Sequence, residues 1–241
     1  NYPFELLPKR FDDMRHLLII LSLILLSSFA ADSIAKKKDD LPEYTVEGLK
    51  RVQNPKYMAL VYAEPGADLH QYDRVYLVEP YVAFKKNWQR EQNRGYAMKV
   101  KKSDMEKIKE GVTKIFMEVF TEELEKGGYK LANERAEDVL IVKPAIIDLN
   151  VNAPDIATPG RTATFTESSG SMTLYLELYD SETNDLLAKA LDRKADRGHG
   201  FMEWQTRVTN IAAGKRMMRP WAEALRKALD EARDATKQVE E

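Results

Sequence analysis

Three aspartates around one predicted turn are the residues whose type and spacing come nearest to acid–base chemistry. They are Asp180, Asp185 and Asp192. General acid–base catalysis needs two carboxylates held in different environments across a cleft. Aspartates at hairpin turns more often accept hydrogen bonds from nearby backbone amides. We therefore predict no catalytic residue, and chemistry by Asp and Arg residues near the hairpin of residues 171–193 stays as the alternative.

Metal binding and nucleophilic catalysis lack their usual residues. The three histidines, His16, His70 and His199, are far apart in the sequence, whereas a metal site needs converging imidazoles and carboxylates. Cysteine is absent, which excludes thiol catalysis, thiolate ligands and a lipid-modified cysteine. There is no Gly-x-Ser-x-Gly elbow and no phosphate-binding glycine loop. We predict no metal and no cofactor.

Four residues in predicted loops are candidates for binding a partner: Trp88, Arg161, Phe165 and Trp204. Trp and Arg are over-represented at binding hot spots, so the loops that hold them are candidate interaction surfaces. Tryptophan is also commonly buried in a small satellite core. Both interpretations are left open.

A predicted hairpin is the element around which the other elements are arranged. Apolar and polar residues alternate from Met172 to Tyr179, residues 180–185 supply turn chemistry, and Leu186 to Asp192 returns as the partner strand. A strict period of two is typical of half-buried strands. Because a hairpin with one apolar face is not stable alone in water, helices must cover it.

Two amphipathic helices are predicted to do so. Ser103 begins a capping-box pattern at the start of the first helix, and Gly127-Gly128 ends it. The second helix is clearest from Pro220 onward and can begin near Val208. The apolar face of the first helix consists of Ile108, Val112, Ile115, Phe116, Val119, Phe120 and Leu124.

Further strands are predicted at residues 58–63 and 74–84, and at 139–151, whose nearly continuous apolar run suits a central position. Pro80 favours an edge, a bulge or a strand end within the second of these. Residues 161–166 alternate and are a candidate edge strand. The predicted fold class is α/β (α+β), a two-layer sandwich with a mixed, mostly antiparallel sheet of about five to six strands covered by two amphipathic helices.

The N-terminal region reads as a secretory leader. Met14-Arg15-His16 precedes an apolar run from Leu17 to Leu26, and small residues follow. Cleavage is predicted after Ala30 or Ala35. The run is shorter than the roughly 20 residues of a membrane-spanning helix, and an uncleaved anchor is the alternative. The predicted division is an upstream extension (1–13), a signal peptide (14–35), a lead-in segment (36–57) and a single α/β domain (58–236).

Composition agrees with a folded, exported domain. Hydrophobic residues make up 44% and charged residues 32%, as in soluble globular proteins. A net charge of -2 gives no general attraction to nucleic acid or anionic membranes. Basic clusters at residues 36–38 and 99–102 are interpreted as solvated charge beside structured segments.

Three stretches resemble the bacterial domain-of-unknown-function family 3313. They are "YAEPGADLHQYDRVYLVEP" (Tyr62 to Pro80), "LYLELYDSETNDLLAKALDR" (Leu174 to Arg193) and "WAEALRKAL" (Trp221 to Leu229). The resemblance implies an exported, often lipid-anchored envelope protein with an α/β sandwich, and it carries over no catalytic residue. This sequence lacks the lipobox cysteine of many relatives.

We therefore predict an exported, non-enzymatic binding or adaptor protein of the bacterial cell envelope, located in the periplasm or at the envelope. Its predicted partner is an envelope or periplasmic protein, without nucleic acid and without a stable membrane span after signal cleavage. The alternative is a periplasmic small-molecule binder or hydrolase that uses the hairpin Asp and Arg residues. A purely structural envelope protein is a third interpretation.

Overall fold

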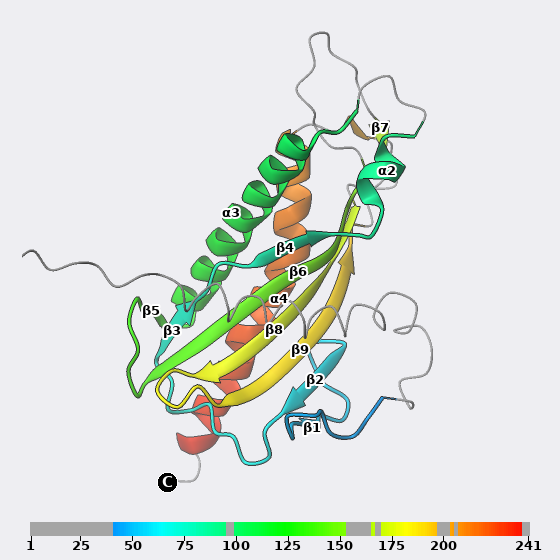
Figure 1. Ribbon diagram of the computed structural model, residues 1–241. Coiled ribbons are helices and arrows are strands. Elements are labelled where there is room, and N and C mark those ends of the chain that lie inside the picture. Colours follow the sequence, from blue (N-terminus) through cyan, green and yellow to red (C-terminus); the bar gives the residue numbers. More distant parts are fainter. Residues whose placement is uncertain are drawn as a thin grey trace, which may run out of the picture. The chain divides into compact units, whose positions relative to one another are not determined.

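The strand–turn–strand segment predicted from the alternating residues forms the middle of a large sheet. A computed structural model of the protein describes residues 41–94, 99–152, 165–166, 170–196, 203–204 and 207–237 (Figure 1). Strand β8 (Gly170–Asp180) pairs antiparallel with β9 (Leu186–Ala195) on one side and with β6 (Val139–Val151) on the other. The hairpin and the long central strand are confirmed.

Short strands complete this eight-stranded sheet, whose order is β1-β2-β9-β8-β6-β3-β5, with β4 also paired to β6. The pairs from β1 to β6 along this order are antiparallel, whereas β3, β4 and β5 run parallel to their neighbours. The sheet is therefore mixed and mostly antiparallel, as predicted. The short strands are β1 (Lys50–Arg51), β2 (Leu60–Ala63), β3 (Arg74–Leu77), β4 (Tyr81–Phe84) and β5 (Lys130–Leu131).

The strand predicted at residues 74–84 is two strands, because Pro80 interrupts it. β3 lies beside the first part of β6 and β4 beside its second part. Proline has no N–H to donate to a neighbouring strand, so the pairing stops between the two. The two-residue strands β1 and β5 are too short to produce a periodic pattern, and the sheet has more strands than the five or six predicted. β1 and the buried Leu49 lie inside the predicted lead-in segment 36–57.

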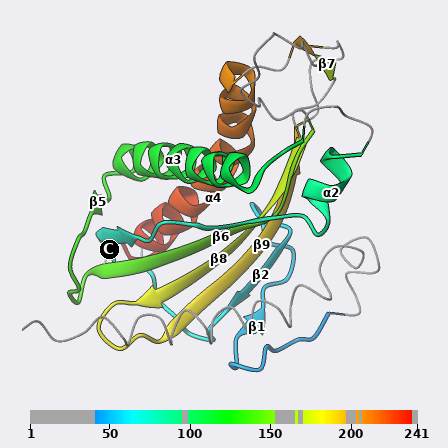
Figure 2. The same cartoon turned by 45° about the horizontal axis from the view of Figure 1, so that its top comes forward.

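Two long helices, α3 (Lys102–Lys126) and α4 (Arg207–Lys237), cover the same face of the sheet (Figures 1 and 2). Their apolar side chains join those of the sheet in one core. Phe116 and Phe120 of α3 stack there, with 3.9 Å between ring centroids. Full burial of side chains of this size stabilises the fold by about 1.5–3 kcal/mol each. The predicted cover of the hairpin by two amphipathic helices is confirmed.

The start of α3 differs from the predicted capping box on Ser103. The Asp104 carboxylate accepts a hydrogen bond from the backbone N–H of Lys101 at 2.9 Å, so Lys101 is the residue before the helix. A carboxylate in the first turn also suits the positive end of the helix dipole. At the other end Gly128 takes a positive φ of 81°, as expected where a chain leaves a helix.

Helix α4 begins well before Pro220, which lies inside it. Proline within a helix lacks the N–H that the preceding turn requires and bends the axis, and α4 changes direction along its length (Figure 2). Met217, Met218 and Trp221 are buried on either side of Pro220. Packing of these residues against the sheet therefore stabilises a helix that the proline alone would interrupt.

A third, short helix and a second sheet complete the described fold. α2 (Trp88–Gln92) follows β4. β7 (Phe165–Thr166) and β10 (Glu203–Trp204) pair antiparallel in a separate two-stranded sheet, which includes part of the candidate edge strand at residues 161–166. In the portions of the chain given above, no helix has the length and apolar character needed to cross a membrane. The predicted leader, residues 14–35, lies outside the described residues.

Candidate functional site

The hydroxyl of Tyr72 and the carboxylate of Asp180 join two distant parts of the chain at the hairpin turn. Tyr72 is buried and donates to Asp180 Oδ2 at 2.8 Å. The other oxygen, Oδ1, accepts the N–H groups of Glu182 and Thr183, each at 2.8 Å. Burial and the hydrogen bond to Asp180 raise the pKa of Tyr72 to about 12, so its hydroxyl stays protonated at neutral pH. Asp180 therefore caps the turn and anchors Tyr72.

Ser181, the next residue, fastens the turn to the loop before β6. Its side chain is completely buried. Oγ donates to the carbonyl of Ala136 at 2.7 Å and accepts from the N–H of the same residue at 3.0 Å. One hydroxyl thus serves both backbone groups of Ala136: it is the acceptor for the N–H, and it shares the carbonyl with the N–H of Val139, which donates to it at 3.0 Å.

Asp192 joins the hairpin to the closing helix. It is buried and accepts a hydrogen bond from the indole nitrogen of Trp221 at 2.7 Å. The backbone N–H of Ala59 donates to its other oxygen at 3.2 Å, and Lys194 Nζ lies 2.8 Å away. These contacts account for the buried charge of Asp192, because each of its oxygens has a donor.

Asp180 and Asp192 are too far apart to act as a catalytic pair. Asp192 lies opposite Leu174 in the strand ladder, and Leu174 is six residues from Asp180 on β8. At about 3.3 Å per residue, the two carboxylates are about 20 Å apart, whereas paired carboxylates in glycosidases are about 5–9.5 Å apart. The third aspartate, Asp185, is exposed at the turn. Asp180 and Asp192 thus make structural hydrogen bonds within the fold.

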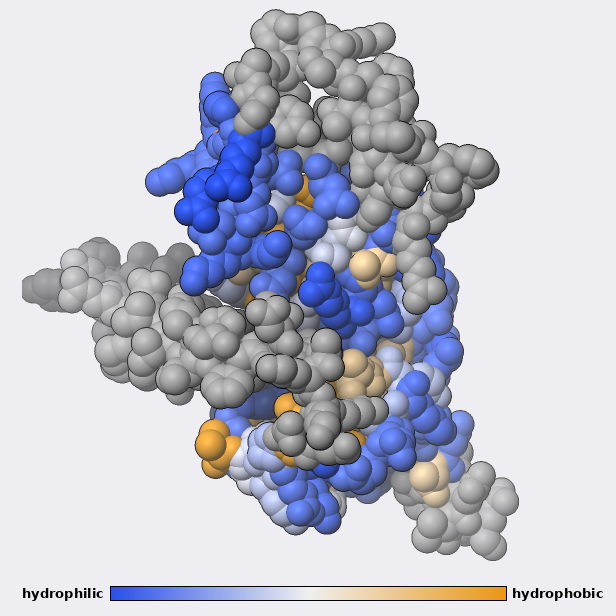
Figure 3. All heavy atoms as spheres, turned by 90° about the vertical axis from the view of Figure 1, so that its right-hand side faces the viewer, coloured by the Kyte–Doolittle hydropathy of each residue, from blue (hydrophilic) through white to orange (hydrophobic). Residues whose placement is uncertain are grey.

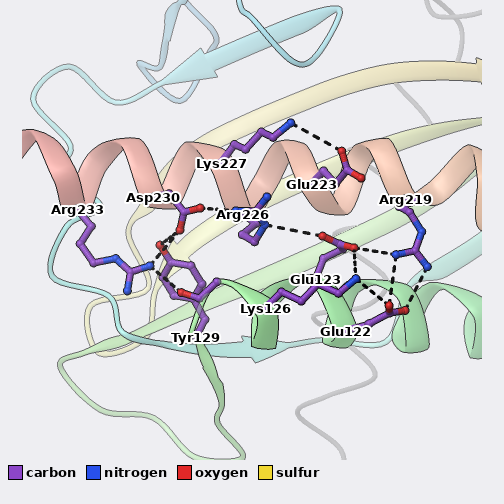
Figure 4. Close-up of polar contacts among 11 residues, drawn as sticks. Glu122, Glu123, Lys126, Tyr129, Arg219, Glu223, Arg226, Lys227, Asp230 and Arg233 are labelled. Carbon is purple, nitrogen blue, oxygen red and sulfur yellow. Dashed lines mark hydrogen bonds and ion pairs between the residues drawn. The ribbon is translucent and has the colours of Figure 1, made fainter.

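An ion-pair network links α3 to α4 (Figure 4). Glu123 is buried and accepts hydrogen bonds from Arg219 at 2.8 Å and from Lys126 at 2.9 Å. Glu122 binds the same two cations in a more exposed position. Hydrogen bonds from Lys126 and Arg219 lower the pKa of Glu122 to about 2. The network stabilises helix–helix packing and keeps the Glu122 carboxylate ionised at neutral pH.

A second group of polar contacts closes the C-terminal end of α3 (Figure 4). The guanidinium of Arg233 lies 4.3 Å from the centroid of the Tyr129 ring and donates to the carbonyl of Gly127 at 3.0 Å. Tyr129 donates to Asp230 at 3.1 Å. A Cβ at Gly127 would lie 2.8 Å from atoms of both Tyr129 and Arg226, so this close approach requires glycine.

The sheet face opposite α3 and α4 carries five tyrosines, and we call it the tyrosine face. Tyr175 and Tyr179 of β8 alternate with the core leucines, and neighbouring strands add Tyr62, Tyr76 and Tyr81. The strand register places Tyr76 and Tyr179 on either side of one residue of β6, and Tyr81 and Tyr175 on either side of another. Tyr76 is 39% and Tyr81 52% exposed.

Charged residues form a row across the middle of the tyrosine face. Lys143, Glu177 and Lys189 are adjacent in register on β6, β8 and β9. Glu177 is 8% exposed, and it accepts the hydroxyls of Tyr175 at 2.7 Å and Tyr179 at 2.8 Å. Lys189 Nζ lies 3.7 Å from Glu177. The carboxylate therefore fixes the two tyrosine rings in place.

The electrostatics of the tyrosine face keep Tyr175 and Tyr179 protonated, as their hydrogen bonds to Glu177 require. Burial and the negative charge of Glu177 raise the pKa values of Tyr175 and Tyr179 far above the usual tyrosine value, so both hydroxyls remain donors. Burial lowers the pKa of Lys143, while Glu177 opposes this effect. Lys143 Nζ lies 5.8 Å from the centroid of the Tyr179 ring. Tyrosine is enriched at the cores of protein interfaces.

Of the four predicted binding residues, Trp88 is 1% exposed, so its indole does not form a surface hot spot. It stacks on Phe84 with 4.2 Å between centroids and donates to the carbonyl of Val151 at 3.1 Å. This is the satellite core that the sequence left open. The structure pairs Phe165 with Trp204 in the β7–β10 ladder, and Arg161 lies outside the described residues. A binding role for these three residues stays a prediction.

The sequence pattern did not predict the tyrosine face, although it showed the face of the one strand that contains Tyr175 and Tyr179. The polar positions of β8 were identified as one face of a strand, and Tyr175 and Tyr179 occupy them. Tyr76 and Tyr81 are five residues apart, so a single strand would place them on opposite faces. Because the strand is interrupted at Pro80, Tyr76 and Tyr81 belong to two separate strands and lie on the same face of the sheet. Only the pairing register of these strands with β6 reveals this arrangement.

Metal ligands are not gathered at any described site. No group of three or more His, Asp or Glu residues in the part of the chain that the structure describes could hold a metal ion. His70 pairs with the neighbouring Asp68 in an exposed loop. His16 and His199 lie outside the described residues.

These features define a two-layer α/β sandwich whose buried acidic residues stabilise the fold. The chain belongs to the family described as "Protein of unknown function (DUF3313)", whose family model matches residues 39–225. The resemblance in the three sequence stretches is thereby confirmed. Tyr72 and Asp180 connect the first stretch to the second, and Asp192 and Trp221 connect the second to the third.

No curated protein matches this chain. Among solved structures, a PelC dodecamer from Paraburkholderia phytofirmans is similar with 12% identity and a TM-score of 0.35, covering 69% of this chain and 96% of that chain. Protein XCC0632 from Xanthomonas campestris has 11% identity and a TM-score of 0.37, covering 68% of this chain and 88% of that chain. Similarities at this level support no functional argument.

Proposed function

We propose that this protein is an exported, non-enzymatic binding or adaptor protein of the bacterial cell envelope, and that the tyrosine face docks a partner protein. The observation that carries the proposal is the arrangement of five tyrosines around Lys143, Glu177 and Lys189 on the sheet face opposite α3 and α4. Tyrosine offers a large contact area and a hydroxyl at a low cost in side-chain entropy. Such a surface suits a protein partner.

Two further observations support a binding protein over the hydrolase alternative. Asp180 and Asp192, the carboxylates that the alternative would use, are engaged in structural hydrogen bonds. Their separation along β8 also prevents them from acting on one bond. Export is supported by the predicted signal peptide at residues 14–35 and by what the family resemblance implies. The segments that hold Arg161, Phe165 and Trp204 are proposed as a second part of the binding surface.

The proposal is tested by photo-crosslinking in cells. A photoreactive phenylalanine analogue replaces Tyr76 or Tyr81 in one set of strains, and Tyr44 in the control strain. Tyr44 is 50% exposed and precedes β1, outside the tyrosine face, so it matches the others in type and exposure. We expect one dominant envelope protein to be captured from positions 76 and 81 and not from position 44.

The outcomes separate the three functional interpretations. The same products from all three positions, or none, would contradict docking on the tyrosine face. A small molecule that co-purifies with the protein in the absence of any crosslinked partner would favour the ligand-binding alternative. Y76A/Y81A should reduce partner recovery while Y44A does not, and both variants should keep the unfolding midpoint of the wild type because these side chains are exposed.

A further inference from the structure

One end of the molecule carries a concentration of positive charge that the net charge of the chain conceals. Residues 85–102 contain seven basic residues and one acidic residue, although the whole chain has a net charge of -2. This segment runs from the end of β4 through α2 to the first residue of α3. All seven of its cations are exposed. Two of them, Lys85 and Lys99, have partners in the fold, and we call the other five the basic patch: Lys86, Arg90, Arg94, Lys101 and Lys102.

Hydrogen bonds to Val100 hold the two halves of this segment together. The backbone N–H of Val100 donates to Asn93 Oδ1 at 2.7 Å, and its carbonyl accepts from Gln89 Nε2 at 2.9 Å. Lys99 Nζ donates to the carbonyl of Asn93 at 2.6 Å. Val100 itself is buried. The cations of α2 and those at the start of α3 therefore lie near each other in the fold as well as in the sequence.

Within the described residues, no carboxylate pairs with the basic patch. None of its five side chains has a hydrogen bond or an ion pair with the described part of the protein. The nearest acids in sequence are already engaged. Glu91 lies 3.7 Å from Lys85, which is outside the patch, Asp104 binds the N–H of Lys101, and Glu106 pairs with Lys109 at 3.0 Å.

Two physical arguments bear on how this charge could interact with an anionic ligand. Lys101 and Lys102 stand at the N-terminal, positive end of a 25-residue helix, where cations are unfavourable for helix stability. At physiological salt the Debye length is about 8 Å, so acidic residues much further than this from the patch have little effect on the electrostatic potential near it. A ligand surface therefore experiences the local charge and not the net charge of the chain.

We propose that the basic patch binds the anionic phospholipid surface of an envelope membrane and holds the protein there peripherally. Clusters of four to eight Lys and Arg residues are typical of proteins that bind anionic lipid headgroups. Single-stranded nucleic acid would also need exposed aromatic rings for stacking, but the aromatic residue of α2, Trp88, is buried. The α2 side of the molecule faces the viewer in Figure 3, and its described surface is largely hydrophilic.

The inference rests on the proposed export, since it requires an envelope membrane, but it does not depend on the tyrosine face. It also supplies a means of membrane attachment that does not require the lipobox cysteine of many relatives, which is absent from this sequence. Peripheral binding through the basic patch would leave the tyrosine face free for a partner.

The test is co-sedimentation of the purified protein with vesicles of phosphatidylcholine, with and without phosphatidylglycerol. The patch variant is R90Q/K101Q/K102Q. Its control is K114Q/K130Q/R135Q, which removes the same number of Lys and Arg residues from exposed positions further along α3 and beyond it. The comparison is repeated as the salt rises from about 0.1 M to about 1 M, which shortens the Debye length from about 10 Å to about 3 Å.

We expect the wild type and the control variant to bind vesicles that contain phosphatidylglycerol and to be released by salt. The patch variant should bind at least tenfold more weakly, because each basic residue near an anionic surface contributes about fivefold. No binding by the wild type, equal binding to phosphatidylcholine alone, or equal weakening of the two variants would overturn the proposal. Crosslinks from Lys101 to an acidic protein in cells, with no vesicle binding, would also overturn it. Because no partner protein is present in the vesicle assay, its failure is distinct from failure of the docking proposal.

Discussion

The indole nitrogen of Trp221 donates a hydrogen bond to the carboxylate of Asp192 at 2.7 Å, inside the contact between the closing helix and the sheet. Both side chains are buried. A similar bond, from Tyr72 to Asp180, lies at the opposite end of the hairpin. The residues that make this chain resemble its family are thus partners of one another. They form an internal framework around β8 and β9.

Replacing Trp221 by Phe should destabilise the protein more than replacing Trp88 by Phe. Both indoles are buried, but Trp221 donates to a charged acceptor, and such bonds contribute about 1.5–3 kcal/mol. Trp88 donates to the carbonyl of Val151, which also accepts from Gln92 at 3.1 Å, so W88F should cost about 0.5–1 kcal/mol. Urea unfolding followed by circular dichroism measures both. Equal losses would show that ring packing, and not the bond to Asp192, dominates.

Ser181→Ala should destabilise the turn although it removes a single oxygen atom. The hydroxyl serves both the N–H and the carbonyl of Ala136, and a buried polar group without a partner costs about 1–3 kcal/mol. Amide hydrogen exchange should become faster in residues 134–140 as well as in the turn. Ser103→Ala is the control, since that serine is exposed, and it should leave both measurements unchanged. Unaltered exchange at Ala136 in S181A would contradict the role assigned to the hydroxyl.

The network between α3 and α4 makes part of the stability depend on pH in the acid range. Lys126 and Arg219 lower the pKa of Glu122 from 4.5 to about 2. Because the folded-state pKa lies below the unfolded-state value, the carboxylate stabilises the fold above pH 4.5, and this contribution is lost as the pH falls toward 2. The difference in unfolding free energy between the wild type and E122Q should therefore shrink over this window.

A matched variant distinguishes this effect from general acid sensitivity. Glu110 is exposed on the same helix and has no ion pair in the described residues. E110Q should follow the wild type at every pH. Unfolding curves measured between pH 6 and the acid limit would contradict the assignment if E122Q and E110Q changed in parallel. High salt should reduce the E122Q difference, because these charges lie near the surface.

Replacing either of two glycines by alanine should change the stability of the protein, but in opposite directions. At Gly170 the φ angle is +140°, and an added Cβ would lie 1.9 Å from the carbonyl oxygen of Asn150. G170A should destabilise the protein by about 2 kcal/mol or more, because the strain of a positive φ angle in alanine and the clash of its Cβ with Asn150 both contribute. Gly111 lies within α3 and has no atom within 4 Å of its Cβ position. G111A should stabilise by about 0.5–1 kcal/mol. Thermal unfolding checks both signs.

The elements with long periodic patterns were predictable from the sequence. The hairpin, the central strand 139–151 and the apolar face of α3 follow from residue periods of two or 3.6, which depend on neighbours in the chain. The first half of α4 was less clear because Pro220 and Gly214 oppose it locally. Its stability there comes from buried side chains such as Met217 and Met218, and tertiary packing of this kind is not visible in a local pattern.

The candidate site was predictable only in part, because it depends on register between strands. The sequence showed that Tyr175 and Glu177 share a face, but not that Lys143 and Lys189 flank Glu177 on both sides. The burial of Trp88 likewise depends on Phe84 and on the carbonyl of Val151, which is distant in sequence. The hydrogen bonds from Tyr72 to Asp180 and from Trp221 to Asp192 also join residues that are far apart in the sequence, so a local pattern does not reveal them.

The pairing of β2 with β9 and of β3 and β4 with β6 sets the order in which the chain can fold. The first four strands can form no more than the β1–β2 pair among themselves. Apart from the short β3–β5 pair, the remaining partners of these strands are β6 and β9, so most of the first half of the chain has no strand partner until β6 and β9 are available. Contacts of such long sequence separation also make folding slow. If the chain is exported, this delay would keep it unfolded long enough to be threaded through a narrow translocation channel.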